Sequence, residues 1–330
     1  MSDNACCSDS SGAMAYYTVY GVTIWSDVPL RSPLTIATPP HDLRITEAHG
    51  TLALDGAQVL TIVPDEYRND LNIEAAYRLG SDDLLLFPGG DQVLLRADQM
   101  TYHHAGPEGT REDYVDARLL GTVFAWWLLR QGRIPLHAGA VVLDGEAVLF
   151  LAERGTGKSS MLASLLAGGV PLLCDDFVAV YLSVDGEPLA ASAYPQMRLW
   201  PQTIEQFIGS TDEYPSVFDE GTKRRVPVGG AWGRFLAGLY PVTRIYLLQR
   251  GTANEGEIEV RRCTGHEAFM SLLSALLMSA NFPASDLQRV WPDLQQMAER
   301  VPIYELTYPT GWQWMPHLHR VIAEPPRVAE

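Results

Sequence analysis

The chain has 330 residues, of which 47% are apolar and 19% charged, so it is long enough for one large domain or two ordinary ones of about 150 residues each. This composition excludes a fibrous or wholly disordered protein. The 24 basic and 40 acidic side chains give a net charge of −16, which disfavours extended binding to nucleic acid or to anionic lipid. We therefore expect no nucleic-acid partner, and we expect any phosphate site to be local.

The apolar stretches are shorter than the roughly 20 residues that a membrane-spanning helix needs. The start, MSDNACCSDS, also lacks the basic-then-apolar order of an export signal. The four cysteines have neither the spacing of a zinc module nor the density of a disulfide framework, and His103 and His104 are predicted to be surface residues. We expect a cytoplasmic protein with reduced thiols and no membrane partner; a homo-oligomer is left open.

Small and polar residues fill positions 1–15, which we expect to form a disordered tail. From 16 to 110, short β-rich runs such as YYTVYGVTIW and DDLLLFPGG alternate with Gly, Pro and Asp turn signals, which predicts a small antiparallel β-rich domain. Residues 111–131, REDYVDARLLGTVFAWWLLRQ, carry acidic residues early and an arginine late, which predicts a helix that bridges to the second half. The second domain is expected to span 111–330.

A glycine-rich motif follows the next apolar run. Residues 152–159 read AERGTGKS, which matches the phosphate-loop pattern of Gly, any four residues, Gly, Lys and Ser/Thr, except that Ala152 replaces the first glycine. The strand-like run VLFL precedes the motif and leucines at helical spacing follow it, a context that favours a phosphate loop over a chance turn. Such a loop directs backbone N–H groups, a lysine and a metal-binding serine at nucleotide phosphates. The predicted cofactors are ATP and Mg²⁺, and the predicted binding residues are Gly155, Thr156, Gly157, Lys158, Ser159 and Ser160.

Two consecutive aspartates, Asp175 and Asp176, interrupt the apolar run VPLLCDDFVAVYLSV beyond the predicted helix. Adjacent carboxylates are costly to bury without compensation, which favours a role with a cation or in proton transfer. One could hold Mg²⁺ while the other accepts the proton of an attacking hydroxyl, a division of labour that phosphoryl transfer needs. The alternative is a strand that ends in a polar turn with exposed aspartates.

Residues 209–234 are rich in Gly, Pro and charge, and we expect them to form a long loop. Basic side chains there either close over a triphosphate or form a solvated charge run. The candidates are Lys223, Arg224 and Arg225, with Arg198 and Arg250 as weaker ones because arginines are common at strand ends.

The run 128–181, from LLRQGRIPLHAGAVV to LLCDDFVAVY, resembles the catalytic domain of the HPr serine kinase/phosphorylase family. The likeness comprises a histidine followed by small residues before the hairpin, the glycine-rich loop, and the double aspartate at similar spacing. The segments YPQMRLWP, KRRVP, YPVTRIYLLQRG and VPIYELTYP look like the HPr-kinase-like proteins found with lasso-peptide gene sets. Some members of that group phosphorylate a serine hydroxyl at the C-terminus of a precursor peptide.

The resemblance implies an α/β fold: a P-loop, HPr-kinase-like (PEP carboxykinase-like) catalytic domain preceded by a small β-rich domain. It also implies an ATP-dependent kinase that transfers the γ-phosphate to a serine-type hydroxyl of a peptide or protein, a lasso precursor peptide included. The implied roles are Lys158 and Ser159 on nucleotide and metal, Asp175 as base, Asp176 as metal or substrate partner, and His137 beside the phosphates.

Three other functions remain open: a kinase of a small hydroxyl compound, a simple ATPase, and a non-catalytic module that senses nucleotide. The sensor is favoured by two departures from the family pattern, which are Ala152 and Gln196, where the family has a metal-holding glutamate. Ser160, in place of an acidic residue, is a third departure. The long signature loop linked to the phosphorylase reaction is not found, so we expect neither that reaction nor HPr as substrate.

Overall fold

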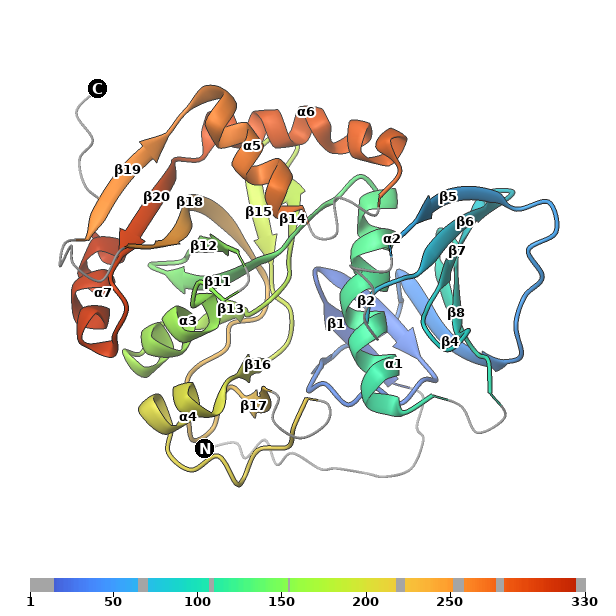
Figure 1. The fold of residues 1–330 in the computed structure, drawn as a ribbon, viewed down its shortest axis with the longest axis horizontal. Helices are drawn as coiled ribbons and strands as arrows, with labels where there is room; N and C mark the ends of the chain where they lie inside the picture. Colours follow the sequence, from blue (N-terminus) through green and yellow to red (C-terminus); the bar gives the residue numbers. More distant parts are fainter. Residues whose placement is uncertain are drawn as a thin grey trace.

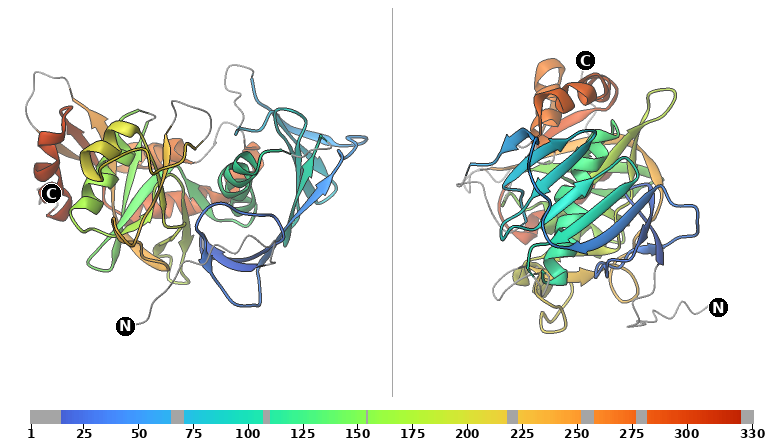
Figure 2. Two further views of the ribbon diagram at one scale, coloured as in Figure 1. Left: turned by 90° about the horizontal axis from the view of Figure 1, so that it is seen from below. Right: turned by 90° about the vertical axis from the view of Figure 1, so that its right-hand side faces the viewer.

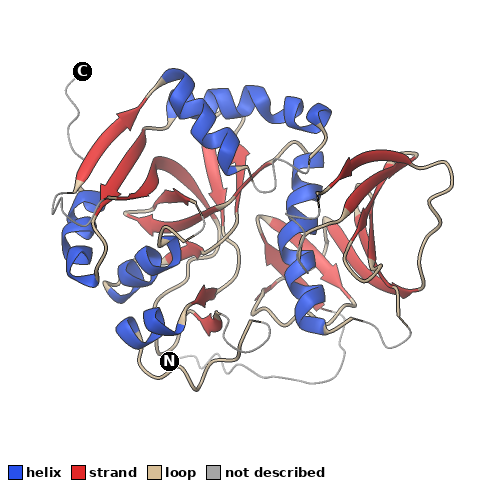
Figure 3. Cartoon of the chain, in the orientation of Figure 1, coloured by secondary structure: helices blue, strands red, loops and turns tan. Residues whose placement is uncertain are grey.

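The computed structural model describes residues 15–64, 71–106, 110–153, 155–217, 223–251, 258–276 and 282–324. The tail expected over 1–15 lies outside these ranges except for Ala15. Within the described residues the chain forms two nine-stranded sheets, a two-stranded sheet, and helices between and around them, which is a mixed α/β fold (Figures 1 and 3).

The first sheet contains the N-terminal strands. They are β1 (Ala15–Val19), β2 (Val22–Ser26), β3 (Thr35–Ile36), β4 (Leu43–His49), β5 (Gln58–Ile62), β6 (Ala75–Leu79), β7 (Asp82–Leu86), β8 (Gln92–Leu95) and β9 (Gln99–His104). Their order is β3-β1-β2-β4-β9-β8-β7-β6-β5. Most neighbours are antiparallel, but β4 pairs in parallel with both β2 and β9, so the sheet is larger and more mixed than predicted. The parallel pairs arise because the chain makes an excursion through other strands before it returns.

A helical segment lies between the two large sheets. It consists of α1 (Glu112–Arg118), the π-helical η2 (Leu119–Val123) and α2 (Phe124–Arg130), and the first sheet curves around it (Figure 2). Almost every side chain of η2 and α2 is buried, because the segment is covered on both sides. One hydrophobic cluster contains Ile24 of the first sheet, Phe124 of the segment and Leu149 of the second sheet, so the two halves share a core.

Buried polar contacts fix the helical segment to the first sheet. A guanidinium nitrogen of Arg118 lies 2.7 Å from Oδ2 of Asp91, which also accepts a hydrogen bond from the hydroxyl of Tyr102 at 2.9 Å. Nearby, His104 is buried, with Nε2 3.3 Å from a carboxylate oxygen of Glu47, so the prediction that it is a surface residue is wrong. Every second side chain of β9 is buried, and His104 occupies one of these buried positions.

The second sheet contains the glycine-rich motif. Its strands are β10 (Ile134–Leu136), β11 (Ala138–Leu143), β12 (Glu146–Ala152), β13 (Leu172–Cys174), β14 (Val178–Leu182), β15 (Pro188–Ala191), β18 (Leu239–Arg250), β19 (Glu259–Cys263) and β20 (Ile303–Tyr308). Their order is β10-β14-β15-β18-β12-β11-β13, with β20 beside β18 and β19 beside β20. Because β12, β18 and β20 are parallel, their C-terminal ends meet at one edge, where ligands bind in open α/β sheets.

Helices cover both faces of this sheet. They are α3 (Lys158–Ala167), α4 (Pro201–Phe207), α5 (Gly265–Ala275), α6 (Ala284–Arg300), the 3₁₀ turn η4 (Trp312–Trp314) and α7 (Met315–Ala323). Side chains of α3 and α7 share one core with Phe150, whereas α5 and α6 pack into the core that contains Leu149. Strand β12 is therefore buried on both faces, which explains its unbroken apolar run. None of the helices described is long and apolar enough to span a membrane.

The expected loop 209–234 contains a strand. Residues Arg224–Pro227 form β17, which pairs antiparallel with β16 (Gln196–Leu199). The prediction failed because RRVP is short, charged and without a hydrophobic period. Residues 218–222 of this segment lie outside the described residues.

Candidate functional site

The glycine-rich loop joins the end of β12 to the start of α3, so the predicted order of strand, loop and helix is present. Gly155 has φ +89° and Gly157 has φ +107°, values that side-chain-bearing residues rarely adopt. Gly157 precedes the first helical residue, Lys158. The unpaired N–H groups of the first turn of α3 therefore border the loop, which is the usual geometry for binding an anion.

Two residues from the neighbouring parallel strands pack against this loop. The guanidinium of Arg250 lies so close to Gly157 that a Cβ at that glycine would overlap it. Arg250 also lies 4.8 Å above the ring of Tyr308, whose hydroxyl donates a hydrogen bond to the carbonyl of Thr156 at 3.3 Å. Arg250 was only a weak candidate from the sequence and Tyr308 was missed, because strand pairing, not spacing, brings both to the loop.

Lys158, His137 and Asp176 converge from three separate segments. Lys158 Nζ lies 3.3 Å from Nε2 of His137 and 3.6 Å from Oδ1 of Asp176, and Nδ1 of His137 lies 3.6 Å from the same oxygen. The backbone N–H of His137, between β10 and β11, donates to the carbonyl of Ala275 at 2.7 Å. Lys158 is 7% exposed, whereas the Asp176 side chain is 51% exposed. A nearly buried ammonium thus faces an accessible carboxylate.

The environment fixes the charge states of these groups. Burial, together with the charge of Lys158, lowers the pKa of His137, so the imidazole is neutral at pH 7. Desolvation acts to raise the pKa of Asp176, but the nearby cations, Lys158 first among them, outweigh it, and that pKa lies below its ordinary value. At neutral pH a neutral imidazole and an ionised carboxylate therefore flank the lysine.

Asp175 differs from Asp176 in its exposure, its hydrogen bonding and the direction of its pKa shift. It is 6% exposed, and its Oδ2 accepts a hydrogen bond from the backbone N–H of Arg198 at 2.8 Å. Its Oδ1 is buried and has no hydrogen-bond partner among the described residues. Burial, and then the charge of Asp176, raises the pKa of Asp175. Adjacent carboxylates with pKa values pushed in opposite directions are a common arrangement for acid–base chemistry.

The structure also shows where Ser159 and Ser160 lie and which residues could hold Mg²⁺. Ser160 Oγ lies 3.1 Å from Oγ1 of Thr203 in α4, so it contacts that helix, whereas Ser159 is half-buried in the first turn of α3. No group of three or more His, Cys, Asp or Glu side chains suited to a metal occurs in the described ranges. Mg²⁺ at phosphotransfer sites needs only one or two protein carboxylates, because phosphate and water oxygens complete its shell. Ser159, Asp176 and the unpartnered Oδ1 of Asp175 are donors of the kind it prefers.

Within the basic run at 223–225, Lys223 is the residue that acts on the two aspartates and on His137. The guanidinium of Arg224 instead donates to Ser216 Oγ at 2.9 Å, and that of Arg225 to the carbonyl of Val217 at 3.1 Å.

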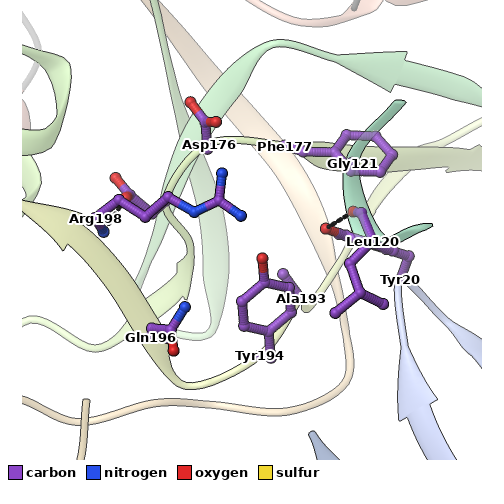
Figure 4. A pocket seen from close by; sticks show the side chains of 10 residues that line it. Tyr20, Leu120, Gly121, Asp176, Phe177, Ala193, Tyr194, Gln196 and Arg198 are labelled. Carbon is purple, nitrogen blue, oxygen red and sulfur yellow. Dashed lines mark hydrogen bonds between the residues drawn. The ribbon is translucent and has the colours of Figure 1, made fainter. Parts of the chain in front are cut away.

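A small cavity of about 40 Å³ adjoins the double aspartate (Figure 4). It lies where the β1–β2 turn, the π-helical η2 and the segment before β16 meet. The residues that line it include Tyr20, Asp175, Asp176, Tyr194, Gln196 and Arg198. The cavity combines residues from both halves of the chain, so no local sequence motif could have predicted it.

No family model and no curated protein sequence matches the chain. Among solved structures, the chain is similar to the HPr(Ser) kinase/phosphatase from Coxiella burnetii, with 12% sequence identity and a TM-score of 0.31, over 57% of this chain and 87% of that chain. A TM-score this low does not establish a common fold, so the functional assignment rests on the residues of the site.

Proposed function

We propose that this protein is an ATP-dependent kinase that transfers the γ-phosphate to a serine-type hydroxyl of a peptide or protein. The observation that carries the proposal is the position of Lys158, which begins the helix after the glycine-rich loop and lies 3.6 Å from Asp176. A phosphate-binding loop, a lysine and two carboxylates with unlike pKa values are the groups that phosphoryl transfer needs in one place. The resemblance of residues 128–181 to HPr serine kinases supports the same reaction.

Each group has a distinct role in this proposal. The loop N–H groups and Lys158 bind the β- and γ-phosphates and neutralise the charge that develops during transfer. The acceptor oxygen attacks the γ-phosphorus while the bond to the β-bridging oxygen breaks, and ADP leaves. Asp175, with its raised pKa, accepts the hydroxyl proton, while ionised Asp176 orients Lys158 and neutral His137 lies beside the phosphates. Ser159 and Asp176 would hold Mg²⁺, which supplies positive charge to the phosphate oxygens.

Nucleotide binding can be tested independently of turnover, because Lys158 and Lys223 are the only lysines in the sequence. An acyl phosphate of ATP acylates a lysine close to the phosphates: the amine attacks the acyl carbon, an amide forms and ATP leaves. We expect peptide mapping to find the label on Lys158 and excess ATP to block it. The Lys223→Ala variant should keep the Lys158 label, and labelling that ATP does not compete for would contradict the phosphate site.

Transfer is tested by incubating the full chain with Mg-ATP and a lasso precursor peptide that ends in serine, and then looking for added phosphate by mass spectrometry. Lys158→Ala should lower the rate by at least about 100-fold, because one transition-state donor contributes that much. The far-UV circular dichroism should be unchanged. Arg262→Ala, on the exposed surface of β19, is the matched control and should be fully active. Full activity of Lys158→Ala would refute the assignment.

A non-catalytic nucleotide sensor is the second candidate, favoured by Ala152 and Gln196, the two residues that depart from the family pattern in the loop and near the metal. Tight Mg-ATP binding without any conversion to ADP would support it. A kinase of small hydroxyl compounds is separated from a peptide kinase by offering L-serine and glycerol in parallel with the peptide.

A further inference from the structure

We infer that a second cavity, in the N-terminal half of the chain where α2 ends, binds a basic group on an aliphatic stem, such as an arginine side chain. Asp98 is the residue that contacts the positive charge. The inference goes beyond the proposed function, because neither the residues of the glycine-rich loop nor Asp175 and Asp176 line this cavity.

This cavity, which we call the α2-end cavity, lies where the first sheet curves around the helical segment (Figure 2). Its volume is about 400 Å³, against about 40 Å³ for the cavity beside the double aspartate. Sites for small molecules usually have volumes of about 300–1,000 Å³. The lining comes from the start of β7, the turn between β8 and β9, and the last turn of α2, and it includes Asp82, Arg96, Asp98, Trp127, Arg130 and Gln131.

Hydrogen bonds fix the last turn of α2 against the turn between β8 and β9. The indole N–H of Trp127 donates to the carbonyls of Arg96 at 3.2 Å and Ala97 at 3.1 Å. The side-chain amide of Gln131 also donates to the carbonyl of Ala97, at 3.1 Å. The Trp127 donor is therefore used within the protein, and the side-chain oxygen of Gln131 is left as an acceptor.

The two arginines on the cavity wall are paired with carboxylates of the protein. Nε of Arg96 lies 2.9 Å from Oδ2 of Asp82. Arg130 lies between two buried carboxylates, with Nε 3.4 Å from Oδ2 of Asp83 and Nη1 3.5 Å from Oδ1 of Asp286. An anionic ligand would have to compete with these carboxylates for either arginine, so the cavity disfavours anions.

The buried carboxylates behind Arg130 are themselves balanced. Asp83 accepts a hydrogen bond from Arg78, and Nη2 of Arg78 lies 3.9 Å from Oδ2 of Asp286. Arg289 also reaches Asp286 at 4.0 Å, but its side chain is 56% exposed, so water screens its charge. Arg78 and Arg130 thus neutralise Asp83 and Asp286, and this group contributes little net charge to the cavity.

Asp98 is the charge on the wall that this pairing leaves over. Its carboxylate makes no ion pair or hydrogen bond with another described residue; only its backbone carbonyl is used, as the acceptor for the N–H of Arg44 at 2.9 Å. The helical segment ends at Arg130, so the negative end of its dipole adjoins the same cavity. Both features favour a cation, because each places uncompensated negative charge at the wall.

The rest of the wall fits an aliphatic stem. Leu95 and Trp127 line the cavity and are largely buried. Basic side chains lay their methylene groups along apolar surface while the charged head contacts polar acceptors, and indole is the aromatic ring that attracts cations most strongly. The net charge of −16 on the chain also draws cations toward it. An arginine side chain combines the stem and the charge that the cavity would bind.

The test compares two blocked tripeptides that differ in charge. Acetyl-Gly-Arg-Gly-amide and its citrulline counterpart have nearly the same shape, but a neutral urea replaces the guanidinium in the second. Each is titrated by NMR, at low salt, against the ¹⁵N-labelled full chain. The arginine peptide should bind wild type about 10-fold more tightly, the gain expected of charge-assisted hydrogen bonds. It should also shift the indole N–H signal of Trp127, which a Trp127→Phe variant assigns.

Asp98→Asn should lower the affinity for the arginine peptide to that for the citrulline peptide. Asp98 is exposed and its backbone hydrogen bond does not depend on the side chain, so the fold should be retained. Asp55→Asn, in the exposed turn before β5, is the matched control and should bind as wild type does.

Equal binding of the two peptides to wild type would overturn the inference, as would no binding at millimolar concentration. A preference for arginine that survives in Asp98→Asn, or binding that leaves the Trp127 signal in place, would overturn it too. Because the ratio of affinities and the Trp127 signal are both measured on wild type, a variant that fails to fold does not obscure the result.

The cation could belong to a peptide or to a free small compound, and n-butylguanidine in the same titration separates the two sources. Tighter binding of the arginine peptide than of butylguanidine would show that the peptide backbone is also contacted, which assigns the site to an arginine residue of a peptide. Equal binding would assign it to a free cation. Either result supports the site, and neither depends on phosphate transfer.

Discussion

The backbone N–H of Arg198 donates a hydrogen bond to Oδ2 of Asp175 at 2.8 Å, so one residue of β16 both orients the buried carboxylate and lines the adjacent cavity. The other oxygen of Asp175 is left without a hydrogen-bond partner among the described residues. A buried carboxylate oxygen without a hydrogen bond destabilises the fold unless the carboxyl group is protonated or a ligand binds it. Substitution of Asp175 therefore tests the proposed reaction directly.

Asp175→Asn should stop phosphate transfer but spare nucleotide binding. The amide oxygen can still accept the hydrogen bond from Arg198, while the capacity to accept a proton is lost. Transfer should fall by about 100- to 10,000-fold, the range of general-base contributions. The affinity for ATP, measured by calorimetry, should equal that of wild type. Asp144→Asn, in the exposed turn between β11 and β12, is the control; wild-type transfer by Asp175→Asn would show that another group is the base.

The same variant should be more stable than wild type at neutral pH. Because the folded-state pKa of Asp175 is raised, the protonated acid favours folding below the ordinary pKa of aspartate, and that stability is lost as pH rises through the raised pKa. Asparagine does not titrate. The gain in unfolding free energy of Asp175→Asn over wild type should therefore be absent below about pH 4 and grow above it. Urea unfolding of both proteins across this range measures the difference; a constant difference would mean that the Asp175 pKa is not raised.

Removing the Asp176 carboxylate should lower the pKa of His137 further. The negative charge of Asp176 acts against burial and Lys158 to raise that pKa, so Asp176→Asn leaves the lowering effects unopposed. The imidazole proton signals of His137, followed by NMR against pH and assigned with a His137→Gln variant, would show the shift. An unchanged titration would indicate that Asp176 does not contact the imidazole in solution.

Gly157→Ala should damage the loop more than Gly155→Ala. Both glycines have left-handed backbone conformations, for which a side chain costs about 1–3 kcal/mol. Only at Gly157 would the added Cβ also overlap the guanidinium of Arg250, whereas at Gly155 the space is open. Thermal unfolding should therefore rank wild type above Gly155→Ala and that variant above Gly157→Ala. Adding Arg250→Ala should recover part of the loss at Gly157 but none at Gly155.

The part of the site that lies close together in the chain could be predicted from the sequence. The apolar run of β12, the two glycines and the helical spacing after Lys158 are local signals, because backbone conformation and hydrophobic period act over a few residues. The pair of adjacent aspartates could also be predicted from the sequence. The difference in their exposure could not, because burial of Asp175 and exposure of Asp176 depend on packing around the turn between β13 and β14.

By itself, the sequence determined the strand–loop–helix unit, the pair of carboxylates and the acidic composition that makes any phosphate site local. Only the tertiary structure decided that Arg250 and Tyr308 pack on the loop, that Tyr20 and η2 reach the double aspartate, and that Arg198 faces a cavity. These groups come from strands and helices far apart in the chain. Their meeting depends on strand order and a shared core, and side-chain burial across such distances leaves no period or spacing in the sequence.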